Sequence, residues 1–277
     1  MTKRVRTVLV TGGGTGLGKA TALRFAAEGD RVAVCGRREG VLQEAAEAFR
    51  RAGAEEARTF VCDVRYDDDV AKMAAALHDA WGPLDVLVNN AAGNFVCPAE
   101  KLSPNGWRAV IEIVLNGTFF CSSAFGRAMI EAHAKDGQGR SMVNVVADYA
   151  WGAGPGVIHS ASAKAGVLAL TRTLAVEWAR HGIRSNAVSP GPFRSDGTDK
   201  NLWLDEKLAA EVLESIPLKR FTTAEEVAES IAFLADETRA AYITGACLPV
   251  DGGHWLTGTN LGSLDAISRA AGPGPRT

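Results

Sequence analysis

Short apolar runs rich in β-branched residues alternate with longer amphipathic stretches along most of the chain. The short runs show little polar alternation, which is typical of parallel strands that are covered on both faces. We therefore predict an α/β fold, a doubly wound parallel sheet in a single domain over residues 1–277. The predicted strands lie at 8–10, 31–35, 59–63, 86–89, 141–146, 183–188 and 247–250, and the predicted helices at 19–28, 41–52, 68–80, 105–130, 163–181 and 224–234.

The composition limits the classes of function. Hydrophobic residues make up 47% of the 277 residues and charged residues 22%, as in globular proteins, and the net charge of -2 predicts no nucleic-acid partner. No apolar run is long enough to cross a bilayer and no secretory leader is recognisable, so we expect a cytoplasmic protein that contacts no membrane. The cysteines and histidines have neither disulfide nor metal-ligand spacing, so we expect buried free thiols and no metal.

Two segments interrupt the alternation. Residues 191–216 follow a Ser-Pro-Gly-Pro turn, have no clear strand and come directly after the sixth predicted strand, where we expect a lid over a substrate. Residues 254–277 end in Gly-Pro-Gly-Pro and predict a C-terminal extension with a frayed tail.

A glycine-rich sequence, TGGGTGLG, occupies residues 11–18, directly after the first predicted strand and before the first predicted helix. Glycines let the backbone pass close to a pyrophosphate, and the amino end of the following helix directs free N–H groups at that anion. The alternative is an ordinary glycine-rich turn. The position after the first strand favours a dinucleotide-binding turn.

Two arginines follow the second predicted strand. Enzymes that use NAD usually place Asp or Glu there for the ribose 2′-hydroxyl, whereas this chain has Gly36, Arg37 and Arg38. Two guanidinium groups suit a 2′-phosphate, so we expect NADP(H) as the cofactor. The alternative is a pair of solvated arginines that opens a helix.

Four features together resemble the short-chain dehydrogenase/reductase family, which has a Rossmann-type fold. They are the spacing of Gly12, Gly16 and Gly18, NNAAG at 89–93, SPG at 189–191 and VDGG at 250–253, so the resemblance spans residues 11–253. It implies a homotetramer and a cofactor site in which Asp63 lies beside the adenine. The implied cofactor-binding residues are Thr11, Gly12, Thr15, Gly16, Leu17, Gly18, Arg37, Arg38, Asp63, Val64, Asn90, Ala91, Lys164, Pro190, Gly191 and Pro192.

The usual catalytic residues of that family are only partly present. Its members carry a Tyr four residues before a Lys on one helix, and a Ser thirteen residues before that Tyr. Here Lys164 is present, but Ser160 occupies the Tyr position and Ala147 the Ser position. A serine hydroxyl is a far weaker acid than a phenol, whose pKa is about 10, so the usual proton relay is missing.

Tyr149 offers a replacement, because it lies just beyond the fifth predicted strand, at the edge where parallel sheets bind ligands. The other tyrosines, Tyr66 and Tyr242, lie far from this point. Tyr149 followed by Lys164 closely resembles mitochondrial-type 2,4-dienoyl-CoA reductases, in which the relocated tyrosine is the working one. The motifs that share the resemblance are NNAAGNF at 89–95, LSPN at 102–105, VLNGT at 114–118 and SASAKAGV at 160–167.

This resemblance implies NADPH-dependent reduction of a 2,4-dienoyl-CoA thioester in the β-oxidation of unsaturated fatty acids. Tyr149 and Asn94 would hold the thioester oxygen, on which negative charge builds. Lys164 would bind the nicotinamide ribose, with support from Asn116 through water. Ser160 would add a hydrogen bond.

Other readings stay open. Tyr149 is alternatively a loop aromatic and Asn94 a turn residue. Arg65, Phe95 and Ser103 match positions that line the acyl-CoA site of the dienoyl reductases, but a packing or surface role is the alternative for each. The rival activities are a trans-2-enoyl-CoA reductase, a 3-oxoacyl reductase or alcohol dehydrogenase, and a catalytically inactive NADP-binding regulator.

Overall fold

The computed structural model describes residues 4–194 and 206–259, which form one parallel sheet and the helices around it. Its seven strands lie in the order β3-β2-β1-β4-β5-β6-β7, and all neighbouring strands are parallel. The predicted doubly wound sheet is confirmed. The strands are β1 Thr7–Thr11, β2 Arg31–Gly36, β3 Glu56–Val61, β4 Val86–Asn89, β5 Arg140–Val145, β6 Ile183–Pro190 and β7 Cys247–Val250.

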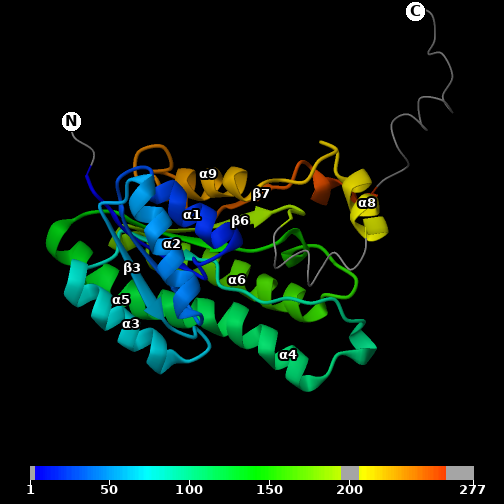
Figure 1. Cartoon of the computed structure of the whole chain (residues 1–277), viewed down its shortest axis with the longest axis horizontal. Coiled ribbons are helices and arrows are strands. Elements are labelled where there is room, and N and C mark those ends of the chain that lie inside the picture. Colours follow the sequence, from blue (N-terminus) through cyan, green and yellow to red (C-terminus); the bar gives the residue numbers. More distant parts are fainter. Residues whose placement is uncertain (1–3, 195–205, 260–277) are drawn as a thin grey trace, which may run out of the picture.

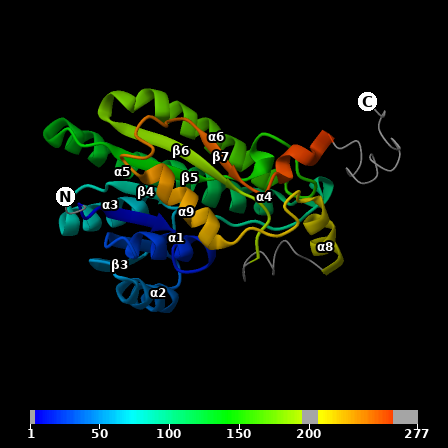
Figure 2. The same ribbon diagram turned by 90° about the horizontal axis from the view of Figure 1, so that it is seen from above.

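Helices cover both faces of the sheet (Figure 1), as the view from above also shows (Figure 2). One face carries α1, α2 and α9, and the other carries α3, α5 and α6, with α4 packed against α6. The helices are α1 Gly16–Ala26, α2 Glu39–Ala52, α3 Asp67–Trp81, α4 Pro104–Ile111, α5 Gly117–Asp136, α6 Ile158–Glu177, α8 Glu206–Ser215 and α9 Ala224–Ala235.

Each face of the sheet has its own hydrophobic core. Phe25 of α1 and Phe49 of α2 are fully buried on one face. Leu87 of β4, Met129 of α5 and Met142 of β5 are fully buried on the other. Strands β1 and β4 are buried at every position, and this double coverage explains why their sequences show no alternation of polar and apolar residues.

Several strand limits differ from the prediction by one residue or more, and the ends of β3 and β6 differ by two, because pairing with the neighbouring strand decides the boundary. β3 ends at Val61 and not at Asp63, since the ladder with its partner stops where Val61 pairs with Gly36, the last residue of β2. β6 continues beyond the predicted end to Pro190, which pairs with Val250 of β7. Asp63 therefore lies in the loop after β3.

Most helix limits also differ by one to three residues, α8 is not predicted, and the largest differences concern α6 and the segment 105–130. α6 begins at Ile158 and not at residue 163, which places Ser160 and Lys164 on one helix, one turn apart. The single helix predicted at 105–130 is divided into α4 and α5 by a π-helical turn, Glu112–Asn116, and continues to Asp136. Turns of this kind occur frequently at functional sites.

The helical segment Pro104–Asp136 is long and apolar enough to cross a membrane, judged by length and composition within the described residues. This is weak evidence, because the core helices of globular proteins pass the same test. Cys121, Phe125 and Met129 of the segment are buried against the sheet. The absence of membrane contact stays a prediction.

The structure describes only parts of the two segments that interrupt the alternation. In the predicted lid at 191–216, residues 195–205 lie outside the described residues, and α8 forms in the remainder. In the predicted extension at 254–277, the 3-10 helix η5 (His254–Thr259) is described and residues 260–277 are not. Figures 1 and 2 place α8 and η5 at the end of the molecule opposite the N-terminus. The lid stays a prediction.

Candidate active site

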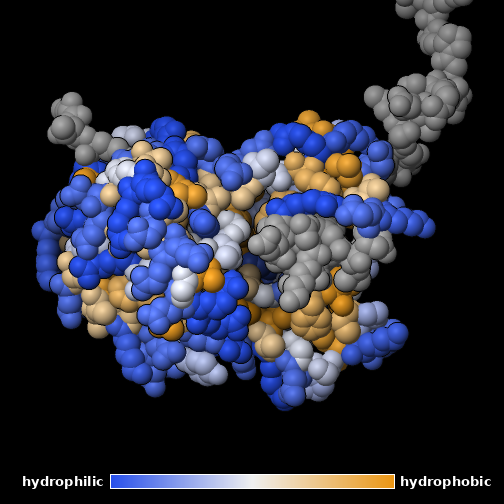
Figure 3. Space-filling view, viewed as in Figure 1, coloured by the Kyte–Doolittle hydropathy of each residue, from blue (hydrophilic) through white to orange (hydrophobic). Residues whose placement is uncertain are grey.

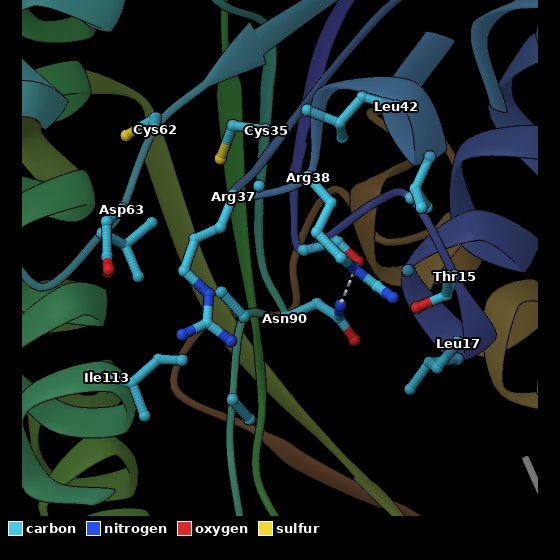
Figure 4. A pocket seen from close by; sticks show the side chains of 18 of the residues that line it. Thr15, Leu17, Cys35, Arg37, Arg38, Leu42, Cys62, Asp63, Asn90 and Ile113 are labelled. Atoms are coloured by element: carbon cyan, nitrogen blue, oxygen red, sulfur yellow. Dashed lines mark hydrogen bonds between the residues drawn. The ribbon is translucent and has the colours of Figure 1, made fainter. Parts of the chain in front are cut away.

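A cavity of about 320 Å³ opens where β1 lies between β2 and β4. The strand order reverses at β1, and ligands of open parallel sheets bind at such a reversal, beyond the carboxyl ends of the strands. Figure 4 shows the cavity from close by. The predicted cofactor-binding residues that line it are Gly12, Thr15, Leu17, Gly18, Arg37, Arg38, Asp63, Val64, Asn90 and Ala91.

The glycine turn between β1 and α1 has no room for side chains. A Cβ atom on Gly18 would lie 2.3 Å from the carbonyl oxygen of Gly12 and 2.5 Å from Asn90 Nδ2. Gly12 itself has φ of +66°, a left-handed conformation that costs other residues free energy. Gly16, with φ of +52°, begins α1. The turn thus presents bare backbone to the cavity.

The amino end of α1 is free to bind an anion. Thr15 is its N-cap residue, and its side chain makes no capping hydrogen bond in the described part of the chain. The first turn, which includes Leu17 and Gly18, has no acidic residue. The first N–H groups and the positive end of the helix dipole are therefore open, which fits the pyrophosphate of a dinucleotide.

Arg37 and Arg38 follow β2 and extend into the cavity (Figure 4). Both are exposed, and neither forms an ion pair with a carboxylate of the described residues. Asp63, which also lines the cavity, binds the Arg65 guanidinium at 2.5 Å, and this contact lowers the pKa of Asp63. Arg65 lies over the ring of Tyr66, so its predicted contact with substrate stays a prediction.

Thr11 and residues 190–192, also predicted to bind the cofactor, lie at the ends of β1 and β6 and are not among the residues that line the cavity. Thr11 Oγ1 accepts hydrogen bonds from the backbone N–H groups of Asn90 and Ala91, both at 2.9 Å, and so joins the end of β1 to the loop after β4. Pro190, Gly191 and Pro192 follow one another at the end of β6. A Cβ atom on Gly191 would lie 2.5 Å from the Cα atom of Asp251, so the close packing of this turn against the end of β7 requires a glycine.

Tyr149 lies on a 3-10 turn, η3 (Asp148–Ala150), soon after β5. Its hydroxyl accepts a hydrogen bond from Asn94 Nδ2 at 3.3 Å and lies 3.1 Å from Ser160 Oγ. Asn94 comes from the loop after β4 and Ser160 from α6, so three separate segments meet at the phenol. Burial raises the pKa of Tyr149 and keeps the phenol protonated at neutral pH.

Lys164 is buried one turn after Ser160 on α6. Its Nζ donates to the carbonyl oxygen of Val145, the last residue of β5, at 2.6 Å. Burial lowers the pKa of Lys164 to about 8, because desolvation penalises the ammonium form. Asn116 ends the π-helical turn, and no hydrogen bond joins it to Lys164 in the described structure. Its support of Lys164 through water stays a prediction.

Phe95 and Ser103, predicted to contact substrate, have structural partners. The Phe95 ring packs against the buried ring of His159, with centroids 4.4 Å apart. Ser103 is exposed and caps α4, since its Oγ accepts a hydrogen bond from the backbone N–H of Gly106 at 3.1 Å. A contact of either residue with substrate stays a prediction.

Sequence reasoning missed a link between η3 and the C-terminal segment. Asp148 Oδ2 lies 2.8 Å from His254 Nδ1, and the rings of Trp151 and Trp255 meet edge to face with centroids 5.9 Å apart. Asp148 and His254 are separated by 106 residues, so no local spacing indicates their contact. The only signal in the sequence is that each lies next to a residue of a recognised motif or site.

Comparison with known proteins decides the family. A family model described as enoyl-(acyl carrier protein) reductase matches residues 12–254, which include both the glycine turn and Lys164. The chain belongs to the short-chain dehydrogenase/reductase family. It is therefore an oxidoreductase, and within this family Ser160 replaces the usual tyrosine.

Three relatives illustrate the similarity. A probable 2,4-dienoyl-CoA reductase, (2E)-enoyl-CoA-producing, from Bacillus subtilis is 50% identical over 252 residues, which cover 91% of this chain and 97% of that protein. A 3-oxoacyl-[acyl-carrier-protein] reductase from Synechocystis is 38% identical, covering 88% and 95%. The crystal structure of a short chain dehydrogenase from Bacillus anthracis is 48% identical, with a TM-score of 0.79, covering 90% and 96%. The predicted resemblance to dienoyl-CoA reductases is confirmed.

Proposed function

We propose that this short-chain dehydrogenase/reductase reduces 2,4-dienoyl-CoA thioesters with NADPH. The observation that carries the proposal is the meeting of the Tyr149 hydroxyl with Asn94 and Ser160 at 3.3 and 3.1 Å, next to a helix that holds Lys164. These groups make a donor cluster at the carboxyl edge of the sheet although the usual tyrosine is absent. The similarity to the Bacillus subtilis relative supports the same substrate class.

Hydride transfer to the diene requires hydrogen-bond donors that stabilise negative charge on the substrate. When bound, NADPH supplies a hydride to the distal carbon of the diene. The electron pair displaced from the conjugated system moves to the thioester oxygen, where Tyr149 and Asn94 donate hydrogen bonds. Each such donor contributes about 2.7–4 kcal/mol to the transition state in comparable sites.

The carbon that takes up the returning proton decides the product. Protonation next to the thioester leaves a 3-enoyl-CoA, and protonation two carbons further along leaves a 2-enoyl-CoA. Chromatographic identification of the product distinguishes the two.

NADP(H) is the cofactor that the cavity fits. The glycine turn and the open end of α1 suit the pyrophosphate, and Arg37 and Arg38 form no ion pair with a carboxylate among the described residues. Charge-assisted hydrogen bonds of about 1.5–3 kcal/mol each predict a preference for NADPH over NADH of about tenfold or more. Arg37→Asp should reduce or invert this preference, whereas Arg51→Asp, at the far end of α2, should leave it unchanged. Equal kcat/KM values with both cofactors in the unmodified protein would refute the assignment.

A substrate panel tests the activity. NADPH oxidation is followed with a 2,4-dienoyl-CoA, a trans-2-enoyl-CoA, a 3-oxoacyl-CoA and a free dienoic acid, each at the same protein concentration. We expect the dienoyl-CoA to give the highest kcat/KM and the free acid to react far more slowly, because the nucleotide handle supplies binding energy that orients the reacting carbons. A higher kcat/KM with the 3-oxoacyl-CoA would favour the activity named for the Synechocystis relative.

The family resemblance also supports a homotetramer. Phe119 of α5 and Val176 of α6 are apolar and 53% and 80% exposed, which suits contact with another copy of the chain. Light scattering of the purified protein measures the assembly. Val176→Glu should shift it toward smaller species, and an unmodified protein that is monomeric at micromolar concentration would refute the tetramer.

A further inference from the structure

Asp148 joins the turn that carries Tyr149 to the C-terminal segment. Asp148 directs its two carboxylate oxygens to different partners: Oδ1 accepts the backbone N–H of Tyr149 at 2.9 Å, and Oδ2 binds His254 Nδ1 at 2.8 Å. The side chains of Asp148 and His254 are 20% and 27% exposed, so bulk water only partly screens the contact. A single carboxylate therefore joins His254 to the backbone of the candidate catalytic tyrosine.

His254 is itself held in a fixed position. Asp251, which is buried, accepts the backbone N–H groups of Gly253 and Trp255 at 3.0 and 2.9 Å and so shapes the turn before η5. The Trp255 ring packs edge to face against Trp151, the residue that follows η3. Because two independent contacts join the same two segments, movement of η5 is transmitted to η3.

We propose that His254, as the imidazolium, is a positioning residue that holds Asp148 and, through it, sets the place and the electrostatic environment of Tyr149. The proposal rests on the function proposed above for Tyr149. It adds a residue from the C-terminal segment whose charge controls the donor cluster. His254 touches neither Asn94 nor Ser160 and acts only through Asp148.

The charge of His254 bears on the phenol because Asp148 is adjacent to it. The negative charge of Asp148 raises the pKa of Tyr149 and opposes the build-up of charge on a substrate oxygen bound there. The positive charge of the His254 imidazolium, bound to Asp148, offsets the effect of this carboxylate. When His254 loses its proton, the carboxylate is left uncompensated beside the donor cluster, and η3 loses its charge-assisted contact with the C-terminal segment.

The groups around His254 determine the pH at which this happens. The hydrogen bond to Asp148 and the charges of Asp148 and Asp251 raise the pKa of His254 above its ordinary value of 6.5, against the effect of burial. The neighbouring segment, which packs on Gly252 and Gly253 through Leu218 and Pro217, carries two cations. These are Lys219 and Arg220, which bind Glu214 and Glu226. The imidazolium therefore persists above pH 6.5 and is lost as the pH rises through the raised pKa.

The first experiment needs no substrate. In the NADPH complex, NMR follows the imidazole of His254 and the ring ζ-carbon of each tyrosine across a pH titration, with Tyr149→Phe to assign the Tyr149 signal. We expect the Tyr149 signal to follow the titration of His254 in the unmodified protein. Asp148→Asn should bring the pKa of His254 down toward 6.5, and His254→Gln should abolish the response of Tyr149. A Tyr149 signal that is indifferent to His254 overturns the proposal, whatever the substrate proves to be.

The second experiment measures turnover with a dienoyl-CoA at saturating NADPH across the same pH range. Since misplacement of a catalytic group costs up to about a hundredfold, we expect His254→Gln to lower kcat about tenfold or more, with the KM for NADPH unchanged. The substitution should also remove the fall in kcat that accompanies deprotonation of His254 at higher pH. Lys164, whose pKa is about 8, also loses its proton as the pH rises, so this fall is assigned by the difference between the profiles of His254→Gln and of the unmodified protein. His78→Gln, on the exposed side of α3, is the matched control and should retain the profile of the unmodified protein.

A purely structural contact gives a different result. It would lower the thermal stability of His254→Gln and leave both the fall in kcat and the Tyr149 signal unchanged, which refutes the proposal. Failure of every substrate in the panel, together with a Tyr149 signal that follows His254, would refute the dienoyl-CoA assignment and leave the positioning role standing.

Discussion

Tyr149 reaches the donor cluster from another part of the chain than the usual tyrosine of this family. That residue would stand on α6 at the position of Ser160, whereas Tyr149 lies on η3 and brings its hydroxyl to 3.1 Å from the serine. The phenol thus stands beside the place that the missing tyrosine would occupy. One site can therefore retain Lys164 and the cofactor cavity while its proton donor approaches from a different direction.

The relocated phenol is tested by two substitutions. Tyr149→Phe removes one oxyanion donor with little change of shape, so kcat with a dienoyl-CoA should fall by about 10²–10³ while NADPH binding is retained. Ser160→Ala should lower kcat much less. If Ser160 has inherited the role of the usual tyrosine, the order of the two effects is reversed, and near-normal turnover of Tyr149→Phe would contradict the mechanism.

The proposed role of Lys164 predicts a cofactor affinity that depends on pH. Burial lowers the pKa of Lys164 to about 8, so the ammonium form, which we propose binds the nicotinamide ribose, is lost as the pH rises through that value. We expect the Kd for NADPH, measured by fluorescence, to be constant near pH 7 and to increase above about pH 8. Lys164→Met has no charge at any pH, so its Kd should be flat and equal to the high-pH value of the unmodified protein. An increase of Kd over the same pH range in Lys164→Met would show that another group causes the pH dependence.

At the scale of elements, we propose that the glycine turn and α1 form one anion-binding unit that depends on backbone alone. Gly12 and Gly18 touch each other across the turn, and the first N–H groups of α1 have no side-chain cap among the described contacts. The unit would bind an anion through dipoles that the fold fixes in advance, so binding would cost the protein little conformational entropy.

Gly18→Ala tests this unit. The added Cβ atom would lie 2.3 Å from a backbone oxygen, which cannot move without shifting the turn, so the Kd for NADPH should increase by at least about a hundredfold. Gly40→Ala is the matched control, because a Cβ atom there meets nothing within 4 Å and Gly40 lies in α2. Calorimetry measures both, and an unchanged Kd for Gly18→Ala would place the cofactor elsewhere.

At the scale of the whole molecule, all of the proposed functional groups lie at one edge of the sheet. The cavity, the donor cluster, the turn after β6 and the segment after β7 all follow the carboxyl ends of strands. Figure 3 shows patches of apolar surface at this end of the molecule. The strands themselves are fixed by two buried cores, so loops that are far apart in sequence are held at constant distances.

Cofactor binding at this shared edge should stabilise the whole fold. At a free concentration of one hundred times Kd, a ligand adds about 2.7 kcal/mol to the free energy of unfolding, which corresponds to roughly 5–10 °C in Tm for a domain of this size. We expect differential scanning fluorimetry to show this shift with NADPH, a smaller shift with NADH at equal concentration, and none with either in Gly18→Ala. Equal shifts with both nucleotides would contradict the role of the two arginines.

The sequence by itself determined the order of the strands and of the helices between them, except for α8 and the division between α4 and α5. It also determined the glycine turn and the basic end of β2. These features follow from local periodicity and from residue types with fixed conformational preferences. It did not determine the ends of β3, β6 and α6, which depend on the length of the neighbouring strand or on packing. Only the tertiary structure decided that Asn94 and Ser160 both lie within 3.3 Å of the Tyr149 hydroxyl oxygen, and that His254 binds Asp148. These contacts depend on the register of parallel strands, which sets how closely loops from separate crossovers approach and which no local pattern contains.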